Sequence, residues 1–350
     1  MAHNIQDTIS NWYAENRRDL PWRNAPTPYQ VWLSEVILQQ TRVNQGMDYY
    51  LRFTERWPSV IDLAQATEEE VLKMWQGLGY YSRARNLYHC ALQVVEQYKG
   101  QFPADFEQLK KLKGIGEYTA AAIASIAFGL PHAVVDGNVY RVLSRLFDIE
   151  TPININEGQK QFSQLANELL NHKHPGLHNQ AMMEFGALQC IPKNPDCQHC
   201  PLQAQCLAFS RQTVSQRPVK LQTTKNLKRY FNYLVIRING SLYLHKRSGN
   251  DIWKNLYDFP CIESQNEMSV EEIVSSEKFF HLIEDQSFTI TRTSPVYTHK
   301  LTHRTILAQF IEIKLEKELL QFQTKGLILT RETELGNFPI PRLIDLYLNN

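Results

Sequence analysis

The sequence predicts a multidomain fold in which an all-α region is followed by an α+β domain. Within residues 1–210, apolar side chains recur at the spacing of amphipathic helices, and no comparable strand pattern occurs. Residues 230–350 differ, because two runs rich in aromatic and β-branched residues, 230–238 and 241–245, enclose an Asn-Gly dipeptide. This arrangement is typical of two strands joined by a tight hairpin turn.

The expected helices of the first region are short, and Gly and Pro residues separate them. Apolar periodicity predicts helices at Ile5–Tyr13, Val31–Val43, Val71–Trp75, Ala84–Tyr98, Phe106–Leu112, Thr119–Phe128, Val139–Phe147 and Phe162–Leu170. In the second domain, further strands are expected at Phe288–Arg292 and Thr305–Ile313, and a helix at Ser269–Ser276. Residues 211–229 have few large apolar side chains and are expected to be an interdomain linker.

Positive charge is concentrated in this linker. The chain of 350 residues has a formal net charge of +1, but residues 211–229 contain six basic residues and no acidic residue. Such a linker is either solvated or in contact with DNA, and the sequence leaves both readings open. No apolar run reaches the ~18 residues needed to cross a bilayer, and the N-terminus lacks a signal-peptide core. We therefore expect a cytoplasmic protein with no membrane partner. We also expect a monomer, because no oligomerisation signal is visible in the sequence.

Four cysteines lie close together at the end of the helical region. Cys190, Cys197, Cys200 and Cys206 have the spacing C-x6-C-x2-C-x5-C. Four thiolates in one short loop suit a metal centre, either zinc or an iron–sulfur cluster, and the spacing alone does not decide between them. A disulfide pair is not expected in a cytosolic chain.

This cysteine spacing, directly after a helical domain, resembles the cluster loop of the endonuclease III and MutY branch of the DNA glycosylases. The resemblance implies that the four cysteines hold a [4Fe-4S] cofactor. It extends over most of the chain, from Trp12 to about Leu346, and is weaker in the second domain.

A glycine-containing turn joins two of the expected helices at residues 109–119. Gly114 and Gly116 allow positive φ and a close approach of the backbone, and Thr119 lies in the first turn of the next helix. Free backbone amides at such a turn form an anion site, although an ordinary helix-packing element has the same pattern. The segment is similar to the helix-hairpin-helix motif of the same superfamily, which implies that Gly114 and Gly116 contact a DNA phosphate.

Two carboxylates are candidate catalytic groups. Glu35 has apolar neighbours on both sides, and burial would raise its pKa; Asp136 precedes an expected helix, where it has an alternative role as an N-cap. Cleavage of an N-glycosidic bond needs a proton donor and an ionised carboxylate near the sugar. The family resemblance implies that Glu35 protonates adenine N7 and that Asp136 stabilises or traps the oxocarbenium ion. It also implies that Asn138 orients Asp136 and that Glu184 is a further carboxylate of the pocket.

Tyr118 distinguishes two branches of this superfamily. Relatives with lyase activity have a lysine at this position, whose amine attacks the sugar. The tyrosine of this chain therefore implies a monofunctional glycosylase. Lys113 is close in sequence but precedes the hairpin.

Further residues match segments that contact DNA in the family. The segments "LQQT" and "GLGYYSRAR" imply that Gln40 and Tyr80 intercalate around 8-oxoguanine and that Thr41 contacts DNA. Arg23 matches a residue near the target adenine. Read singly, two consecutive tyrosines are usually core residues, and a Gln-Gln pair usually lies on a polar helix face.

The second domain resembles the Nudix-like C-terminal domain of the MutY type at Leu242–Arg247 and Ile252–Pro260. The Glu-rich signature of Nudix hydrolases is absent, so lesion recognition is expected rather than nucleotide hydrolysis. The family loop Phe-Ser-His is represented by Leu301, Thr302 and His303. Thr302 and His303 keep the hydroxyl and the imidazole, whereas Leu301 departs from the pattern.

Together these resemblances imply an adenine DNA glycosylase of base-excision repair. Its expected partner is double-stranded DNA with adenine opposite 8-oxoguanine or G, and its expected location is the cytoplasm, with the nucleoid of a bacterial-type cell. Three alternatives remain: a glycosylase of the same fold for thymine or uracil in G mismatches, an endonuclease III-like glycosylase and AP lyase, and a non-catalytic iron–sulfur DNA-binding protein. A panel of mispaired duplexes, borohydride trapping and the effect of Asp136→Asn discriminate among them.

Overall fold

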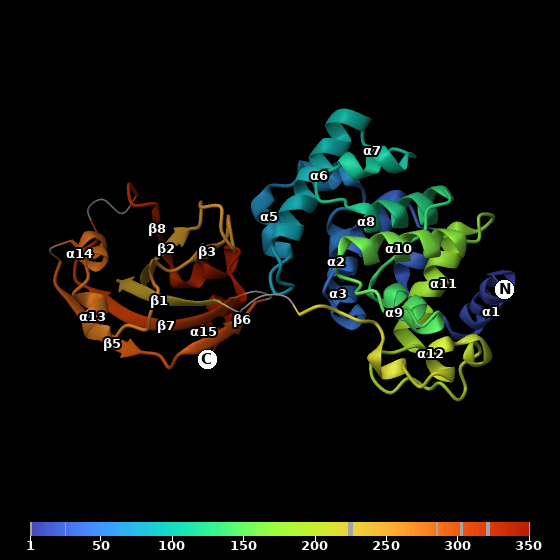
Figure 1. Cartoon of the computed structure of the whole chain (residues 1–350). Helices are drawn as coiled ribbons and strands as arrows, with labels where there is room; N and C mark the ends of the chain where they lie inside the picture. The colour runs from blue at the N-terminus through green and yellow to red at the C-terminus, as the bar shows by residue number, and fades with distance from the viewer. Residues whose placement is uncertain are drawn as a thin grey trace. The chain divides into compact units, whose positions relative to one another are not determined.

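The computed structural model of the chain describes residues 2–24, 26–222, 227–284, 286–301, 304–319 and 323–349. Its contacts divide the chain into two compact units (Figure 1). The helical unit consists of Met1–Gln65 and Asn86–Gln222, and the sheet unit consists of Ala66–Arg85 and Thr223–Asn350.

In the described residues of the helical unit, all regular structure is helical, as the sequence predicts. The helices are α1 (Ala2–Asn16), α2 (Pro28–Leu38), α3 (Val43–Arg56), α4 (Val60–Gln65), α6 (Ser82–Tyr98, which begins in the sheet unit), α7 (Phe106–Lys111), α8 (Glu117–Ala122), α9 (Gly137–Leu146), α10 (Asn156–Glu168), α11 (Pro175–Leu188) and α12 (Leu207–Ser210). Short 3-10 turns lie at Pro21–Arg23, Gln203–Gln205 and Val214–Gln216, and a π-helical turn at Ile123–Ala127 follows α8.

Local sequence explains where several helices begin and end. α2 starts at a capping box, in which Thr27 and Gln30 exchange backbone and side-chain hydrogen bonds, and Pro28 occupies the first helical position. The expected single helix Val31–Val43 is wrong, because α2 ends at Leu38 and Gln40 has a positive φ of 57°. The apolar spacing continues across this break, so periodicity did not reveal it. Periodicity also missed α3, α4, α11 and α12.

The core of the helical unit lies among α1, α9, α10 and α11. Ile5, Ile9 and Tyr13 of α1 are buried in one apolar cluster with Leu143 of α9 and Phe185 of α11. Burial of each such side chain contributes about 1.5–3 kcal/mol, so the cluster holds α9 and its N-terminal residue in a fixed position. Cys190, Cys200 and Cys206 pack against the same cluster.

Residues 211–222, the described first part of the expected linker, pack on the helical unit. The Arg217 side chain is buried, and its guanidinium lies 2.9 Å from Asp148 Oδ1 and 2.7 Å from Glu150 Oε1. The amide of Ile153 donates to the carbonyl of Val219 at 3.0 Å. Part of the positive charge of the expected linker is therefore paired within the protein.

The sheet unit contains eight strands among its described residues, which form one sheet, as expected for an α+β domain. The strands are β1 (Leu227–Ile238), β2 (Ser241–Lys246), β3 (Tyr257–Asp258), β4 (Cys261–Ser264), β5 (Phe288–Thr293), β6 (Tyr297–Lys300), β7 (Arg304–Leu315) and β8 (Leu327–Arg331). The helices are α5 (Glu68–Met74), α13 (Val270–Val274), α14 (Glu277–Ile283) and α15 (Arg342–Leu348), with a 3-10 turn at Glu332–Asn337.

The long strands β1 and β7 are parallel and form the centre of the sheet, in the order β3-β2-β1-β7-β5. The other pairings are antiparallel, with β4 on β1, β6 on β7 and β8 on β2. The predicted hairpin of β1 and β2 is confirmed: Ile238 pairs with Ser241, and Asn239 and Gly240 both have positive φ, 45° and 75°. The apolar core of the sheet unit includes Leu234 and Ile236 of β1 and Ile311 and Ile313 of β7.

Residues 66–85 belong to the sheet unit although the sequence analysis placed them in the helical region. Glu69 of α5 accepts hydrogen bonds from Lys246 Nζ at 3.2 Å and from the Tyr257 hydroxyl at 3.0 Å. Lys73 Nζ donates to the carbonyl of Phe338 at 3.1 Å. These contacts join residues more than 170 positions apart in sequence, and local patterns do not encode such pairings.

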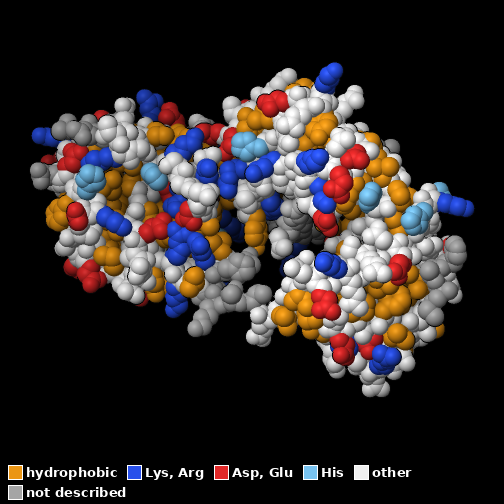
Figure 2. All heavy atoms as spheres, turned by 45° about the horizontal axis from the view of Figure 1, so that its top comes forward, with side chains coloured by type: hydrophobic (Ala, Val, Ile, Leu, Met, Phe, Trp, Pro, Cys, Tyr) orange, Lys and Arg blue, Asp and Glu red, His pale blue; other side chains and the backbone are white. Residues whose placement is uncertain are grey.

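On the face drawn in Figure 2, both acidic and basic side chains are present. None of the helices in the described ranges has the length and apolar character of a membrane-spanning segment.

Candidate active site

A cleft of about 1050 Å³ in the helical unit brings together most of the predicted site residues. Its lining includes Arg23, Glu35, Gln40, Thr41, Tyr118, Asp136, Asn138 and Glu184. They come from α2, α8, α9 and α11 and from the loops beside them, so they are distant in sequence and adjacent in the fold. The structure therefore places these eight predicted site residues around one cleft.

Glu35 lies on α2, and its carboxyl group faces the cleft. The Tyr118 hydroxyl donates a hydrogen bond to Glu35 Oε2 and lies 3.8 Å from the sulfur of Met183. Burial raises the pKa of Glu35 to about 7; the hydrogen bond from Tyr118 and the charge of Arg23 oppose this shift, and nearby Asp136 adds to it. Glu35 is therefore protonated in a large fraction of molecules near neutral pH.

Asp136 is the N-cap of α9, and its carboxylate is held by three N–H donors. Oδ1 accepts from the amides of Asn138 at 2.8 Å and Val139 at 2.7 Å, and Oδ2 accepts from Asn138 Nδ2 at 2.8 Å. Burial raises the pKa of Asp136 above its ordinary value, and these donors act in the opposite direction. The N-cap reading from the sequence is therefore confirmed, and the same residue also lines the cleft.

The surroundings of the two carboxyl groups decide which one holds a proton. Asp136 accepts three N–H hydrogen bonds, each of which favours the charged form, whereas the hydrogen bond to Glu35 Oε2 comes from one neutral phenol. Burial and the negative charges of Glu35 and Asp136 keep the pKa of Tyr118 well above its ordinary value, so the phenol remains a donor. These surroundings favour the protonated form at Glu35 and oppose the effect of burial at Asp136, where they favour the charged form.

Glu184 is buried, with 1% of its side chain exposed, and two arginines hold it. Arg18 donates from Nε at 2.9 Å and from Nη2 at 2.6 Å, and Arg23 donates from Nη1 at 3.0 Å and from Nη2 at 2.7 Å. Burial alone would raise the pKa of Glu184, but these hydrogen bonds lower it to about 2. Glu184 is therefore an anchor for Arg23 and not a second proton donor. Sequence reasoning missed Arg18.

Replacement of Glu184 by Gln is expected to destabilise the helical unit by about 3 kcal/mol at pH 7, because two arginine side chains lose their anionic partner. The folded-state pKa of Glu184 is below its unfolded value, so the stabilisation is present above pH 4.5 and is lost as the pH falls towards 2. Chemical denaturation of the wild type and of Glu184→Gln between pH 3 and 7 measures the difference in their free energies of unfolding. A difference that is independent of pH would contradict the ion-pair explanation.

Two arginines of α9 connect the cleft to the cysteine loop. Arg141 Nη2 donates to Asn138 Oδ1 at 2.8 Å and to the carbonyl of Gly186 at 2.6 Å, and its Nε donates to the carbonyl of Cys190 at 2.7 Å. Arg145, which is also buried, lies 3.4 Å from Cys190 Sγ and donates to the carbonyl of Ile191 at 2.8 Å. The sequence analysis did not single out either arginine.

The four predicted cysteines line one small cavity beside Arg145. Within the described part of the chain, no group of three or more His, Cys, Asp or Glu side chains is arranged to hold a single metal ion. A four-iron cluster takes one cysteine per iron, so its ligands surround a cavity and do not converge on one point. The four thiols and the neighbouring cation therefore fit a negatively charged cluster.

The remaining predicted contact residues lie outside this cleft. Gly114 has a φ of 77°, as expected for the turn, and a Cβ there would lie 2.6 Å from Asn86 Cβ. Gly116 does not use the positive φ that a glycine allows, since it is the N-cap of α8 with a φ of −91°, and a Cβ there would meet open space. Tyr80 is in the sheet unit and is 50% exposed. Thr302 and His303 lie outside the described residues.

Comparisons with known proteins agree with this geometry. The family model of the HhH-GPD superfamily base excision DNA repair proteins matches residues 33–171, and that of the NUDIX domain matches residues 232–350. An adenine DNA glycosylase of Buchnera aphidicola subsp. Baizongia pistaciae is 33% identical, over 89% of this chain and 86% of that protein. One of Arabidopsis thaliana is 36% identical, over 92% of this chain and 58% of that longer protein. A solved thermostable thymine-DNA glycosylase has a TM-score of 0.56 and 29% identity, covering 60% of this chain and 97% of that one.

Proposed function

The chain belongs to the adenine DNA glycosylase family, and we propose that it hydrolyses the N-glycosidic bond of adenine opposite 8-oxoguanine or G in duplex DNA. The observation that carries this proposal is the pair of carboxyl groups in one cleft, with Glu35 protonated near neutral pH and Asp136 held by three N–H donors. Such a pair meets the two requirements of N-glycosidic cleavage.

In the proposed reaction, the target adenine leaves the base stack and enters the cleft. Glu35 gives its proton to adenine N7 as the bond between C1′ and N9 breaks and its electron pair passes to the base. The positive charge that develops on the sugar is stabilised by the carboxylate of Asp136. Water then adds to C1′, and its proton returns to Glu35. The N–H donors of Asn138 and Val139 keep the Asp136 oxygens in place throughout.

The proposal excludes a lyase step. Lyase chemistry needs an amine that attacks the sugar, and the position beside Glu35 is occupied by the phenol of Tyr118. The raised pKa of Tyr118 makes its phenolate a negligible nucleophile near neutral pH. We therefore propose a monofunctional enzyme, whose product is an abasic site in an intact strand.

Single-turnover base release from an 8-oxoguanine:adenine duplex tests the proposed function. We expect adenine release that is faster than from a G:A duplex, no release from an 8-oxoguanine:cytosine duplex, and strand breakage only after alkali treatment. G:T and G:U duplexes are included because a thymine-DNA glycosylase is among the similar structures. Release of thymine or uracil, with adenine retained, would overturn the proposal.

We also propose that Cys190, Cys197, Cys200 and Cys206 hold a [4Fe-4S] cluster. When bound, the cluster would crosslink a loop that has little regular structure and so stabilise the surface beside α9. We expect purified protein to be yellow-brown and to contain about four iron and four sulfide per chain. Colourless protein with about one zinc per chain would refute the assignment.

A further inference from the structure

The loop between β2 and β3 contacts two parts of the sheet unit to which the family resemblance assigns DNA contacts. We propose that this loop, residues 247–256, is a positioning element for lesion recognition. It fixes the segment that carries Tyr80 relative to the hairpin of β6 and β7. The inference rests on the proposed function, because it concerns how the enzyme distinguishes 8-oxoguanine from G opposite adenine. We call residues 247–256 the β2–β3 loop.

One side of the β2–β3 loop is bound to the segment 66–85. Arg85 Nη1 donates to the carbonyl of Lys254 at 3.0 Å, and Asn255 Nδ2 donates to Glu68 Oε1 at 2.5 Å. These two contacts lie on either side of Tyr80 in the sequence. The Tyr80 ring is half exposed, and the guanidinium of Arg83 lies 5.7 Å from its centroid. The loop therefore holds both ends of the segment that presents this ring.

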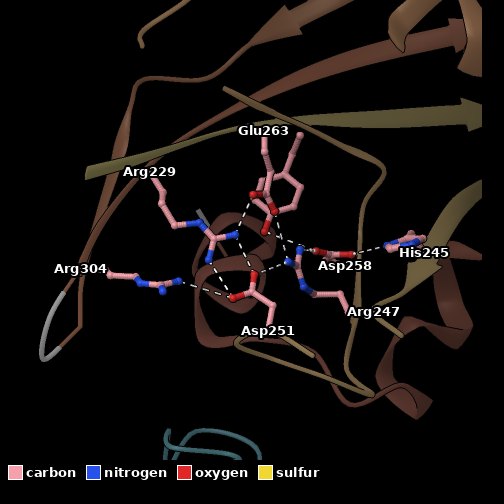
Figure 3. A network of polar contacts seen from close by, with 8 residues as sticks. Arg229, His245, Arg247, Asp251, Asp258, Glu263 and Arg304 are labelled. Atoms are coloured by element: carbon pink, nitrogen blue, oxygen red, sulfur yellow. Dashed lines mark hydrogen bonds and ion pairs between the residues drawn. The ribbon is translucent and has the colours of Figure 1, made fainter. Parts of the chain in front are cut away.

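The other side of the β2–β3 loop is bound to the β6–β7 hairpin. The Trp253 ring lies 5.7 Å from the ring of His299, in β6. The guanidinium of Arg304, the first residue of β7, lies 3.6 Å from Asp251 Oδ1 (Figure 3). The amide of Leu301 donates to the carbonyl of Arg304 at 2.8 Å and closes the described part of the hairpin. Each strand of the hairpin thus touches the same loop.

Asp251 is fixed by more than its pair with Arg304. Arg229 of β1 donates to both of its carboxylate oxygens, at 2.9 and 2.7 Å, and Arg247 Nη2 lies 3.3 Å from Oδ2 (Figure 3). Glu263 accepts from both Arg229 and Arg247, so these two arginines keep an anionic partner if Asp251 is neutralised. A change at Asp251 is therefore expected to release Arg304 without dismantling the network.

The backbone of the loop is also constrained. Trp253 and Asn255 have positive φ values of 60° and 63°, an uncommon conformation for residues other than Gly. This backbone conformation is stabilised by a hydrogen bond from the Asn255 amide to the carbonyl of Arg247 at 2.7 Å and by burial of Trp253 against Phe231. Because the loop backbone is constrained, we expect a displacement of the Tyr80 segment to move the β6–β7 hairpin as well.

If the segment that carries Tyr80 and the β6–β7 hairpin both contact one lesion, the distance between them must be maintained, because a displacement of about 1 Å costs up to about 100-fold in rate. We therefore test Asp251→Asn, which affects the hairpin side, and Asn255→Ala, which affects the Tyr80 side. Glu332→Gln is the matched control, since Glu332 pairs with Arg237 at 2.9 Å elsewhere in the same unit. Single-turnover adenine release is measured on 8-oxoguanine:adenine and G:A duplexes. Each test variant is expected to lower the ratio of the two rates about 5-fold or more, with the G:A rate within about 2-fold of wild type.

Hydrogen exchange gives a readout that does not depend on activity. Asn255→Ala is expected to increase exchange in residues 76–85, next to the lost contact with Glu68. It is also expected to increase exchange in residues 297–301, where the effect must pass through the β2–β3 loop. Exchange in β1 and β8 should remain at the wild-type level, whereas a general loss of stability would raise it there too. Exchange confined to residues 76–85, or a wild-type rate ratio in both folded variants, would overturn the inference. If the wild-type enzyme itself shows no preference for 8-oxoguanine while exchange is transmitted, the proposed substrate is wrong and the positioning role in lesion recognition fails with it.

Discussion

Replacement of Asp136 by Asn is expected to lower single-turnover adenine release by about 10³-fold or more, with DNA binding retained. In the proposed reaction, the substitution removes the negative charge that stabilises the developing oxocarbenium ion, and it leaves the size of the side chain nearly unchanged. The side-chain oxygen that remains in the variant would still accept from the amides of Asn138 and Val139. The new amide nitrogen would replace Oδ2, which now accepts from Asn138 Nδ2, so the local alignment would also weaken.

The competing explanation of Asp136 is that it serves only as an N-cap. Asn is about as good an N-cap as Asp, so a purely structural role predicts nearly normal activity and stability for Asp136→Asn. Asp105→Asn is the matched control, because Asp105 caps α7 by accepting from the amide of Gln108 at 2.8 Å. We expect the control to keep wild-type activity and both variants to keep the wild-type melting temperature within a few degrees. Comparable activity of the two variants would reduce Asp136 to a helix cap.

The sequence predicted which residues line this cleft better than it predicted the electrostatics of those residues. Glu35, Tyr118 and Asp136 each belong to a short segment whose pattern is specific, and the fold brings all three into one cleft. Glu184 was also expected in the pocket, but its partner Arg18 lies 166 residues away. No local signal encodes such a pairing, and the pairing decides whether the carboxyl group of Glu184 donates protons.

The fold shows the same division between local and distant interactions. The Asn239-Gly240 hairpin was predicted because its turn depends on the conformations of two adjacent residues. The assignment of residues 66–85 to the sheet unit was missed because it depends on contacts such as Glu69 with Tyr257, which lie far apart in sequence. Arg141 and Arg145 were overlooked because a helix places such residues on its surface by default; here both are buried against loop carbonyls.

Replacement of Glu35 by Gln is expected to lower single-turnover adenine release by about 10²–10⁴-fold, the contribution typical of a positioned general acid. Because burial raises the pKa of Glu35 to about 7, the active protonated form predominates below pH 7 and is lost above it. The wild-type rate should therefore fall about 10-fold per pH unit well above pH 7, and the residual rate of Glu35→Gln should be independent of pH in this range. A wild-type rate that rises with pH would identify Glu35 as a base.

Tyr118→Phe provides a second test of Glu35 as the proton donor, because this substitution leaves the Glu35 carboxyl group in place. The hydrogen bond from Tyr118 lowers the pKa of Glu35, so its removal should raise that pKa and move the fall in rate to higher pH. The plateau rate at pH 6 should change less than in Glu35→Gln, since the acid remains present. A shift of the inflection to lower pH would mean that the proton reaching adenine does not come from Glu35. Water in the cleft would then be the alternative proton donor, because Glu184, with a pKa of about 2, is ionised throughout this pH range.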